Sequence, residues 1–314
     1  MVSHLHFTEE RQMNARKFIF CTFLFFIFFL ALPLHANAEK LIIYTVNYPL
    51  AYFTERIGGE HVKVVFPVPP DMDPAFWKPD DETVRQFQKA DLIILNGAGY
   101  AKWTRTVSLP MLRMLDTSWA FKDNLIHIDS NVTHSHGPGG DHSHGGTAFT
   151  TWLDFSQAAM QAKAIYKALV RKLPAQKEVL TKNFKKLQGD LLDLDKQMIA
   201  IRDRIAQLPL FASHPIYQYL ALRYKMNIRM MMWEPDEDPG EREWQRLQEV
   251  SKDHPGKWMI WEGEPLAVSI ENLEGMGISS TVFAPCMNRP ESGDFLSVMQ
   301  SNIENLQSVY NAGP

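Results

Sequence analysis

Apolar residues between residues 175 and 208 recur in alternating steps of four and three, which keeps them on one face of an α-helix. They are Leu180, Phe184, Leu187, Leu191, Leu194, Met198, Ile201, Ile205 and Leu208. Pro174 suits a helix start, and Pro209 prevents continuation. A helix of this length spans roughly 50 Å at 1.5 Å per residue. The spacing allows a coiled-coil strand or a rod that joins two lobes, and the flanking sequence favours the rod.

On both sides of this helix, short apolar runs alternate with amphipathic segments. The first side predicts strands at 41–46, 62–68, 91–95 and 125–128, with helices at 49–57, 81–89 and 156–173. The second side predicts strands at 210–213, 228–233, 258–261 and 281–284, with helices at 215–225, 241–252, 265–275 and 294–310. This alternation indicates an α/β fold of two lobes with parallel sheets, at 39–173 and 209–314, joined by one linking helix at 174–208.

The first 38 residues have the order of a secretory signal. Arg16 and Lys17 precede an apolar run at 18–32, and Ala36-Asn37-Ala38 is a small-x-small cleavage site. The alternative is a membrane anchor, but the run is short for a span of about 20 residues. Met1 and Met13 are both possible starts. We therefore expect cleavage and export to a bacterial periplasm.

Net charge bears on the class of binding partner, and cysteine content bears on disulfide bonds. The formal net charge is −4, which gives no reason to expect nucleic acid. Of the two cysteines, Cys21 lies in the signal segment, so only Cys286 remains and no internal disulfide is expected.

Residue types that bind metals stand at the predicted strand ends. Asp73 follows the second strand, and His214, Glu262 with Glu264, and Cys286 follow strands of the second lobe. Ligands of open α/β sheets bind at this edge. Strand ends commonly carry polar residues and helix caps as well, and a single histidine is often structural. Glu234 and the acidic residues 236–238 also follow a strand, where they can contact a partner, border a metal entrance or form a solvated face.

Residues 133–146 form a His-rich segment with Gly and Pro, which predicts a flexible loop. Its four histidines are His134, His136, His142 and His144. Neutral imidazole binds zinc, copper and nickel, so we expect this loop to contact a divalent ion without a preformed site. The alternative is a polar linker with a biased composition.

Several motifs, in order along the chain, resemble one protein family. They are Tyr48-Pro-Leu, Arg56-Ile-Gly-Gly-Glu60, Val68-Pro-Pro with Asp73-Pro74, the segment 90–99, Trp152-Leu-Asp after the His-rich segment, Ser213-His214, the segment 234–240, Trp261-Glu262 and the segment 302–306. The chain resembles the zinc/manganese solute-binding proteins of bacterial ABC importers, of the high-affinity zinc-uptake type. The resemblance implies two lobes on a rod-like helix and a metal ion held between them.

The chain departs from the ligand set that this resemblance implies. A histidine is implied at the position of Ala75, a second at Thr150, and in manganese-type members an aspartate at Ala284. Only His214 and Glu262 are carried over, and two ligands cannot hold zinc tightly.

Three remedies remain open for the missing ligands. Asp73, Glu264 or Cys286 could substitute, the His-rich loop could add imidazoles, or the site could hold another ligand such as a chelated metal. Tryptophans near the strand ends suit a larger ligand or pack beneath the loops; they are Trp77, Trp152, Trp233 and Trp261.

We expect a monomeric periplasmic solute-binding protein that carries Zn²⁺, rather than Mn²⁺, to the membrane permease of an ABC importer, without catalysis or a catalytic cofactor. The alternatives are a relative that binds a non-metal or metal-chelate ligand, a zinc hydrolase with Glu262 as its base, and an exported adhesion protein. A hydrolase needs three protein ligands and an open position, and the chain has no His-Glu-x-x-His motif.

Overall fold

The computed structural model describes residues 39–128, 133–136, 140–143 and 146–311, with the backbone alone for 133–136 and 140–143. Residues 40–314 form one compact unit. The predicted signal segment, residues 1–38, lies outside the described residues. Within the described part of the chain, no helix is both long enough and apolar enough to cross a membrane.

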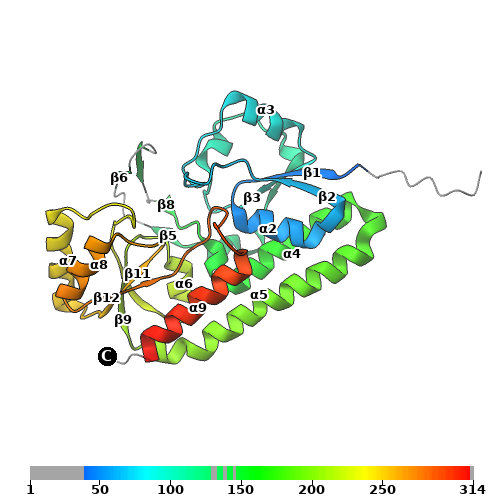
Figure 1. Cartoon of the computed structure of the whole chain (residues 1–314). Helices are drawn as coiled ribbons and strands as arrows, with labels where there is room; N and C mark the ends of the chain where they lie inside the picture. The colour runs from blue at the N-terminus through cyan, green and yellow to red at the C-terminus, as the bar shows by residue number, and fades with distance from the viewer. Residues whose placement is uncertain (1–38, 129–132, 137–139, 144–145, 312–314) are drawn as a thin grey trace, which may run out of the picture. The chain divides into compact units, whose positions relative to one another are not determined.

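The first half of the unit contains a four-stranded parallel sheet with the strand order β2-β1-β3-β4 (Figure 1). Its strands are β1 (Leu41–Thr45), β2 (Val62–Val65), β3 (Leu92–Leu95) and β4 (Met114–Asp116). The predictions of β1, β2 and β3 are confirmed.

The predicted fourth strand, at 125–128, is wrong as a member of this sheet. β5 (His127–Ile128) pairs antiparallel with β8 (Gly146–Thr147), and β4 occupies the edge beside β3 instead. β4 has three residues, Met-Leu-Asp, which is too short for a run of apolar residues to reveal a strand.

The second half contains another four-stranded parallel sheet, with the order β10-β9-β11-β12. Its strands are β9 (Pro209–Ala212), β10 (Asn227–Met230), β11 (Trp258–Trp261) and β12 (Ser279–Val282). All four strands were predicted to within a few residues. Figure 1 shows them in yellow to orange, beside the helices that connect them.

The helices confirm the predicted alternation of strands and helices. The α-helices are α2 (Tyr48–Gly58), α3 (Asp81–Lys89), α4 (Phe155–Lys172), α5 (Lys177–Ile205), α6 (Gln218–Tyr224), α7 (Glu241–Asp253), α8 (Ala267–Gly275) and α9 (Phe295–Asn311). Short 3₁₀ turns lie at Gly59–His61, Lys102–Arg105, Met111–Arg113, Trp119–Asn124, Thr151–Leu153 and Pro174–Gln176. The chain therefore has the predicted α/β fold with two parallel sheets.

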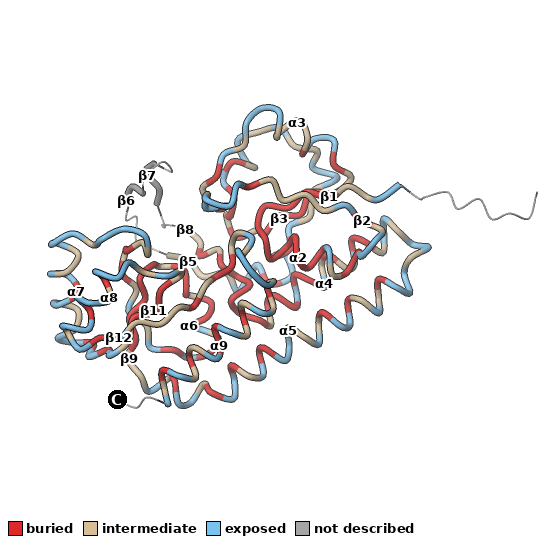
Figure 2. The backbone as a smooth tube through the Cα atoms, viewed as in Figure 1, coloured by how far each residue is buried: buried red, intermediate tan, exposed pale blue. Residues whose placement is uncertain are grey.

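The 29-residue helix α5 links the two halves of the unit. It packs against α2 and α4 beside the first sheet, and against α9, which also contacts β12 of the second sheet. Its predicted apolar residues from Leu180 to Ile205 are all buried, and Figure 2 shows buried and exposed turns alternating along it. Because α5 packs on helices of its own chain, it is a rod within the protein rather than a coiled-coil strand. The exact lobe boundaries, at 173 and 208, stay a prediction.

The His-rich segment contains a β-hairpin where its Gly and Pro content predicted a loop, and its predicted flexibility stays a prediction. β6 (Thr133–His136) pairs antiparallel with β7 (Gly140–Ser143), and position 134 lies opposite position 142. The alternation His-Ser-His on one side and His-Ser on the other has the two-residue period of a strand. Residues 137–139, between the two strands, lie outside the described residues.

One buried polar group interrupts the apolar face of α5. The Asp195 carboxylate accepts hydrogen bonds from Arg223 Nε (3.0 Å) and Nη2 (2.6 Å), and from the Tyr224 hydroxyl (2.9 Å). Asp195 is 6% exposed, so these three donors replace water around its charge. The interaction attaches α6, which precedes β10, to the linking helix.

We predict that Asp195→Ala lowers the free energy of unfolding by about 2–3 kcal/mol, because Arg223 and Tyr224 lose their acceptor. The loss stays below that of a fully buried pair, since about a third of the Arg223 side chain is exposed. Urea unfolding followed by circular dichroism measures the change.

Asp203→Ala is the matched control on the same helix. Asp203 is exposed and pairs with its neighbour Arg202, so its removal changes stability by less than about 0.5 kcal/mol. Equal effects of the two substitutions would contradict the role given to Asp195.

Candidate metal centre

Three polar side chains lie just beyond neighbouring strands of the second sheet. His214 follows β9, Glu262 directly follows β11, and Glu234 lies in the segment after β10. The backbone continues to pair past the strand ends, since the Trp233 N–H donates to the Ser213 carbonyl at 2.7 Å. The carboxyl ends of parallel strands meet at one edge of the sheet, so the three side chains come together there.

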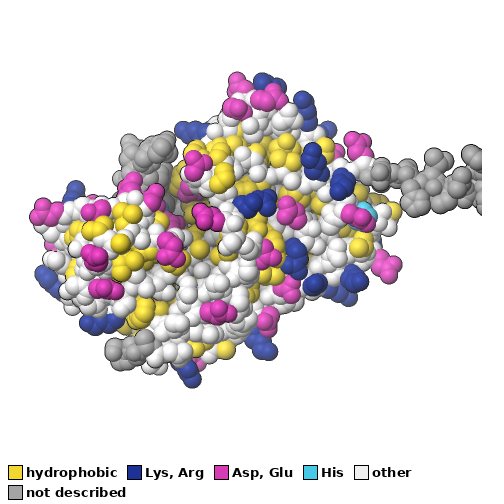
Figure 3. All heavy atoms as spheres, in the orientation of Figure 1, with side chains coloured by type: hydrophobic (Ala, Val, Ile, Leu, Met, Phe, Trp, Pro, Cys, Tyr) yellow, Lys and Arg dark blue, Asp and Glu magenta, His cyan; other side chains and the backbone are white. Residues whose placement is uncertain are grey.

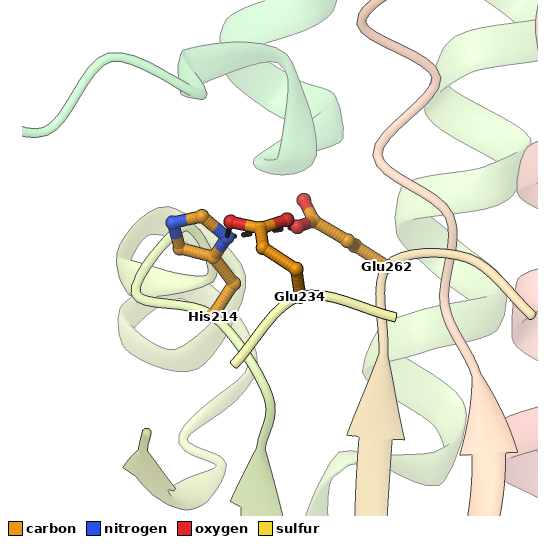
Figure 4. Close-up of side chains that lie close together, drawn as sticks. All are labelled: His214, Glu234 and Glu262. Atoms are coloured by element: carbon orange, nitrogen blue, oxygen red, sulfur yellow. Dashed lines mark hydrogen bonds and ion pairs between the residues drawn. The ribbon is translucent and has the colours of Figure 1, made fainter. Parts of the chain in front are cut away.

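The imidazole of His214 faces both glutamates (Figure 4). Its Nδ1 lies 2.8 Å from Glu262 Oε1 and 2.9 Å from Glu234 Oε1. One ligand atom from each residue falls within 4.8 Å of the other two, and no other group of this kind occurs among the described residues. The His214 side chain is 6% exposed and the two glutamates are 17% and 11% exposed. The cluster is therefore compact and largely shielded from water.

The close contact changes the protonation of the cluster. Burial alone would lower the pKa of His214, but the carboxylates of Glu262 and Glu234 outweigh it and raise the pKa to about 10. Burial raises the pKa of Glu262, and Glu234 adds to this effect while His214 opposes it. At neutral pH the cluster therefore holds at least one proton between the imidazole and the carboxylates.

Asp73, from the segment after β2, lies within electrostatic reach of this cluster. Its Oδ1 accepts a hydrogen bond from the Ala75 N–H at 2.7 Å. The residue is solvent-accessible, but protein atoms crowd its carboxyl group and raise the pKa to about 7; Glu262 and Glu234 raise it further, and His214 lowers it. Asp73 is outside the three-residue group, yet its charge acts on the same site.

The other two proposed substitutes do not join the group. Glu264 is exposed. Cys286 is buried elsewhere, with its Sγ 3.9 Å from the Asn288 carbonyl oxygen. Burial raises the pKa of the Cys286 thiol to about 12, and Asp294 contributes to this rise. Among the described residues, Asp73 is the substitute that the fold brings toward His214.

The positions where the resemblance implies further ligands have other roles. The Thr150 hydroxyl donates to the Ile216 carbonyl, which connects the two halves of the unit. Ala284 exchanges two backbone hydrogen bonds with the side-chain amide of Asn302. Ala75 is 3% exposed and belongs to the apolar core. The four tryptophans near the strand ends are also buried in the core clusters, so they support the loops rather than line an open site.

Three histidines of the His-rich segment lie on the two strands of the β6–β7 hairpin. The backbone is described at His134, His136 and His142, in β6 and β7. His144 lies outside the described residues. Their binding of metal stays a prediction.

A family model described as "Zinc-uptake complex component A periplasmic" matches residues 43–309. The chain belongs to this family. The expected membership is thus confirmed over almost the whole of the described chain.

Individual relatives agree with this membership. The chain is 25% identical over 241 residues to the high-affinity zinc uptake system protein ZnuA of Bacillus subtilis, covering 72% of each. It is 24% identical over 292 residues to the zinc-binding lipoprotein AdcA of Streptococcus pneumoniae, covering 88% of this chain and 57% of that protein. The chain thus spans little more than half of AdcA.

The fold is also shared with solved structures. The metal-dependent lipoprotein YcdH of Bacillus subtilis superposes with a TM-score of 0.72 at 20% identity, covering 87% of this chain and 98% of that chain. At this identity the similarity establishes the fold alone.

Glu234 is the member of the cluster that the sequence analysis placed at a strand end but did not assign as a metal ligand. It stands at a strand end, as His214 and Glu262 do, but it also begins an acidic segment that is typical of a solvated surface. The signal that distinguishes it is Trp233, an apolar residue directly before it that is 3% exposed. The acidic residues at 236–238, by contrast, are exposed.

We predict that His214 titrates with a pKa of about 10 in metal-free protein, well above the ordinary value of about 6.5. Glu262→Gln lowers this pKa, because the imidazolium loses one of its two facing carboxylates. Nuclear magnetic resonance of labelled histidine rings measures both values. Glu264→Gln, which changes an exposed carboxylate two residues away, leaves the pKa unchanged. An ordinary pKa for His214 in the unmodified protein would contradict the geometry of the cluster.

Proposed function

We propose that the chain captures a divalent metal ion at His214, Glu234 and Glu262 and delivers it to the membrane permease of a periplasmic ABC importer. The observation that carries this proposal is the convergence of one imidazole and two carboxylates at one sheet edge. The membership in a zinc-uptake family supports it. The work of the protein is capture and release of an ion, with no catalytic step.

The protonated cluster is suited to reversible metal binding. With His214 neutral and both glutamates ionised, the three ligands carry two negative charges, which match a divalent cation. The Nδ1 atom of His214 lies 2.8–2.9 Å from one oxygen of each carboxylate, and the proton that it carries stands where the ion would bind. Metal binding then exchanges a proton for the ion and preserves the contacts among the three residues.

Zn²⁺ is the cargo that this ligand set and the relatives favour. Imidazole and carboxylate both bind zinc, and a given site of this kind binds Zn²⁺ more tightly than Mn²⁺. The Bacillus subtilis relative is named for high-affinity zinc uptake, which agrees with this choice. Three protein ligands leave one position of a tetrahedral site open, and Asp73, whose charge acts on the cluster, is the carboxylate that we propose to complete it.

A second candidate cargo is a metal ion already held by a small chelator. The Tyr100 hydroxyl is buried and has no hydrogen-bond partner among the described residues. Its pKa is raised well above the ordinary value by burial, with a contribution from Asp73, so it lies within electrostatic reach of Asp73. A chelator that occupies the open position could supply the missing partner of this hydroxyl.

We predict that the mature chain binds one zinc ion tightly and that Glu234→Gln and His214→Ala each weaken this binding at least about a hundredfold. This exceeds the 10–100-fold effect that is usual for groups one step removed from a metal. Calorimetric titration after treatment with a chelator measures the affinity. Glu264→Gln is the control and retains the affinity of the unmodified protein.

Deletion of residues 133–146 separates the two possible zinc sites. If the ion binds at the sheet edge, the deletion variant keeps the high-affinity phase of the zinc titration. Any additional low-affinity phase that comes from the His-rich segment is lost. Loss of all zinc binding on deletion would refute the proposed site. Titration with a chelated ion, in place of the free ion, tests the second candidate cargo.

We predict that zinc affinity rises with pH roughly tenfold per unit between about pH 7 and 9, since the His214 proton must leave. Below about pH 7 the slope steepens if Asp73 joins the ion, because its pKa of about 7 adds a second proton. Competition with a fluorescent chelator at several pH values measures the slope. Asp73→Asn abolishes the steepening, and an affinity independent of pH would contradict the proton exchange.

A further inference from the structure

The hairpin of α4 and α5 carries an unusual excess of positive charge. Residues 163–186 contain eight basic side chains and one acidic side chain, Glu178. We call the eight residues the basic surface; they are all exposed, and they are Lys163, Lys167, Arg171, Lys172, Lys177, Lys182, Lys185 and Lys186. The whole chain has a net charge of −4, so this excess is local and opposite in sign to the rest.

The charges of the basic surface are not neutralised within the protein. None of its residues takes part in an ion pair among the described residues. Lys163, Lys167 and Arg171 follow one another at four-residue steps on α4, a spacing at which like charges repel and destabilise a helix. The arrangement therefore costs stability locally and gains nothing from internal pairing.

A rigid scaffold holds these charges in place. The rings of Tyr166 on α4 and Phe184 on α5 stack at 4.6 Å, and the Tyr166 hydroxyl hydrogen-bonds with Thr181 Oγ1 at 2.8 Å. Leu169 and Leu180 are fully buried between the helices. The relative positions of the lysines on the two helices are thus fixed by packing, even though their side chains extend into solvent.

An open hollow of about 710 Å³ lies on the same surface. Three lysines of the basic surface line it, Lys177, Lys182 and Lys185, with Ala175, Glu178 and Thr181. Figure 3 shows several dark-blue side chains over this part of α5, at the lower right. Several cationic side chains of the basic surface therefore border a shallow and largely open depression.

We propose that the basic surface binds the anionic phospholipid headgroups of the membrane in which the importer lies. Each Lys or Arg close to an anionic membrane strengthens binding about fivefold, so several together give a measurable affinity without inserted apolar residues. The choice of a membrane as partner rests on the proposed function, because a protein that supplies a permease works beside one. Contact with the membrane would hold the protein near its permease. The proposed metal centre, at the edge of the second sheet, would stay free to bind its ion.

The experiment measures co-sedimentation of the metal-free chain 40–314 with vesicles of about one-third phosphatidylglycerol in phosphatidylcholine. The test variant replaces Lys177, Lys182 and Lys185 by Glu. The control variant replaces Lys78, Lys252 and Lys257 by Glu; these lysines are exposed and lie outside the basic surface, so the net charge changes equally. Circular dichroism confirms that both variants are folded.

The unmodified chain should bind these vesicles at least about tenfold more tightly than vesicles of phosphatidylcholine alone, and binding should fall steeply from about 50 to about 300 mM salt. The test variant should lose at least about tenfold in affinity, and the control variant should lose much less. Equal losses in both variants, or no preference for anionic vesicles, would overturn the proposal. So would binding to an acidic protein or nucleic acid in place of vesicles.

The vesicle experiment contains no zinc, so a chain that does not bind vesicles would contradict the membrane proposal without contradicting the proposed metal capture. Zinc titration of the same test variant keeps the two conclusions separate. An unchanged zinc affinity together with lost vesicle binding would assign the two activities to different surfaces.

Discussion

The burial of one face of α5 is the constraint on which the unit depends. Two four-stranded sheets of this size, each with a few helices, gain stability from the helix that both share. The face of α5 packs on α2 and α4 from one half and on α9 from the other, so the apolar core is continuous along it. Asp195 adds a polar attachment to α6, which leads into the second sheet. Everything at the sheet edges is positioned relative to this shared helix.

The same packing explains how a few residues far apart in sequence form a site. His214, Glu234 and Glu262 each follow a different strand, and parallel pairing places those three strand ends at one edge. The site then depends on charge. One imidazole between two shielded carboxylates is stable because it keeps a proton, and under the proposed function a bound cation would take the place of that proton.

The features that the sequence revealed are those with a long or repeated pattern. The eight buried apolar positions of α5, with Leu208 just beyond its end, keep a regular helical spacing, and most strands lie within or beside short apolar runs, so these elements were predicted correctly. β4 was missed because three residues carry no period, and the β6–β7 hairpin was taken for a loop because its glycines outweighed its alternation. His214 and Glu262 could be named from their strand ends. Glu234 was hidden in an acidic segment, and Asp195 in the polar positions of a helix, because only tertiary contacts show which carboxylates are buried.

The composition of the cluster also bears on how the proposed metal site would respond to oxidants. Its donors are nitrogen and oxygen, while Cys286, the free cysteine of the described residues, is buried and separate from the cluster. Thiolate sites lose their metal when peroxide converts sulfur to sulfenic or disulfide forms. The proposed site of imidazole and carboxylates has no sulfur to oxidise, so its affinity for an ion would not depend on the oxidation state of a thiol.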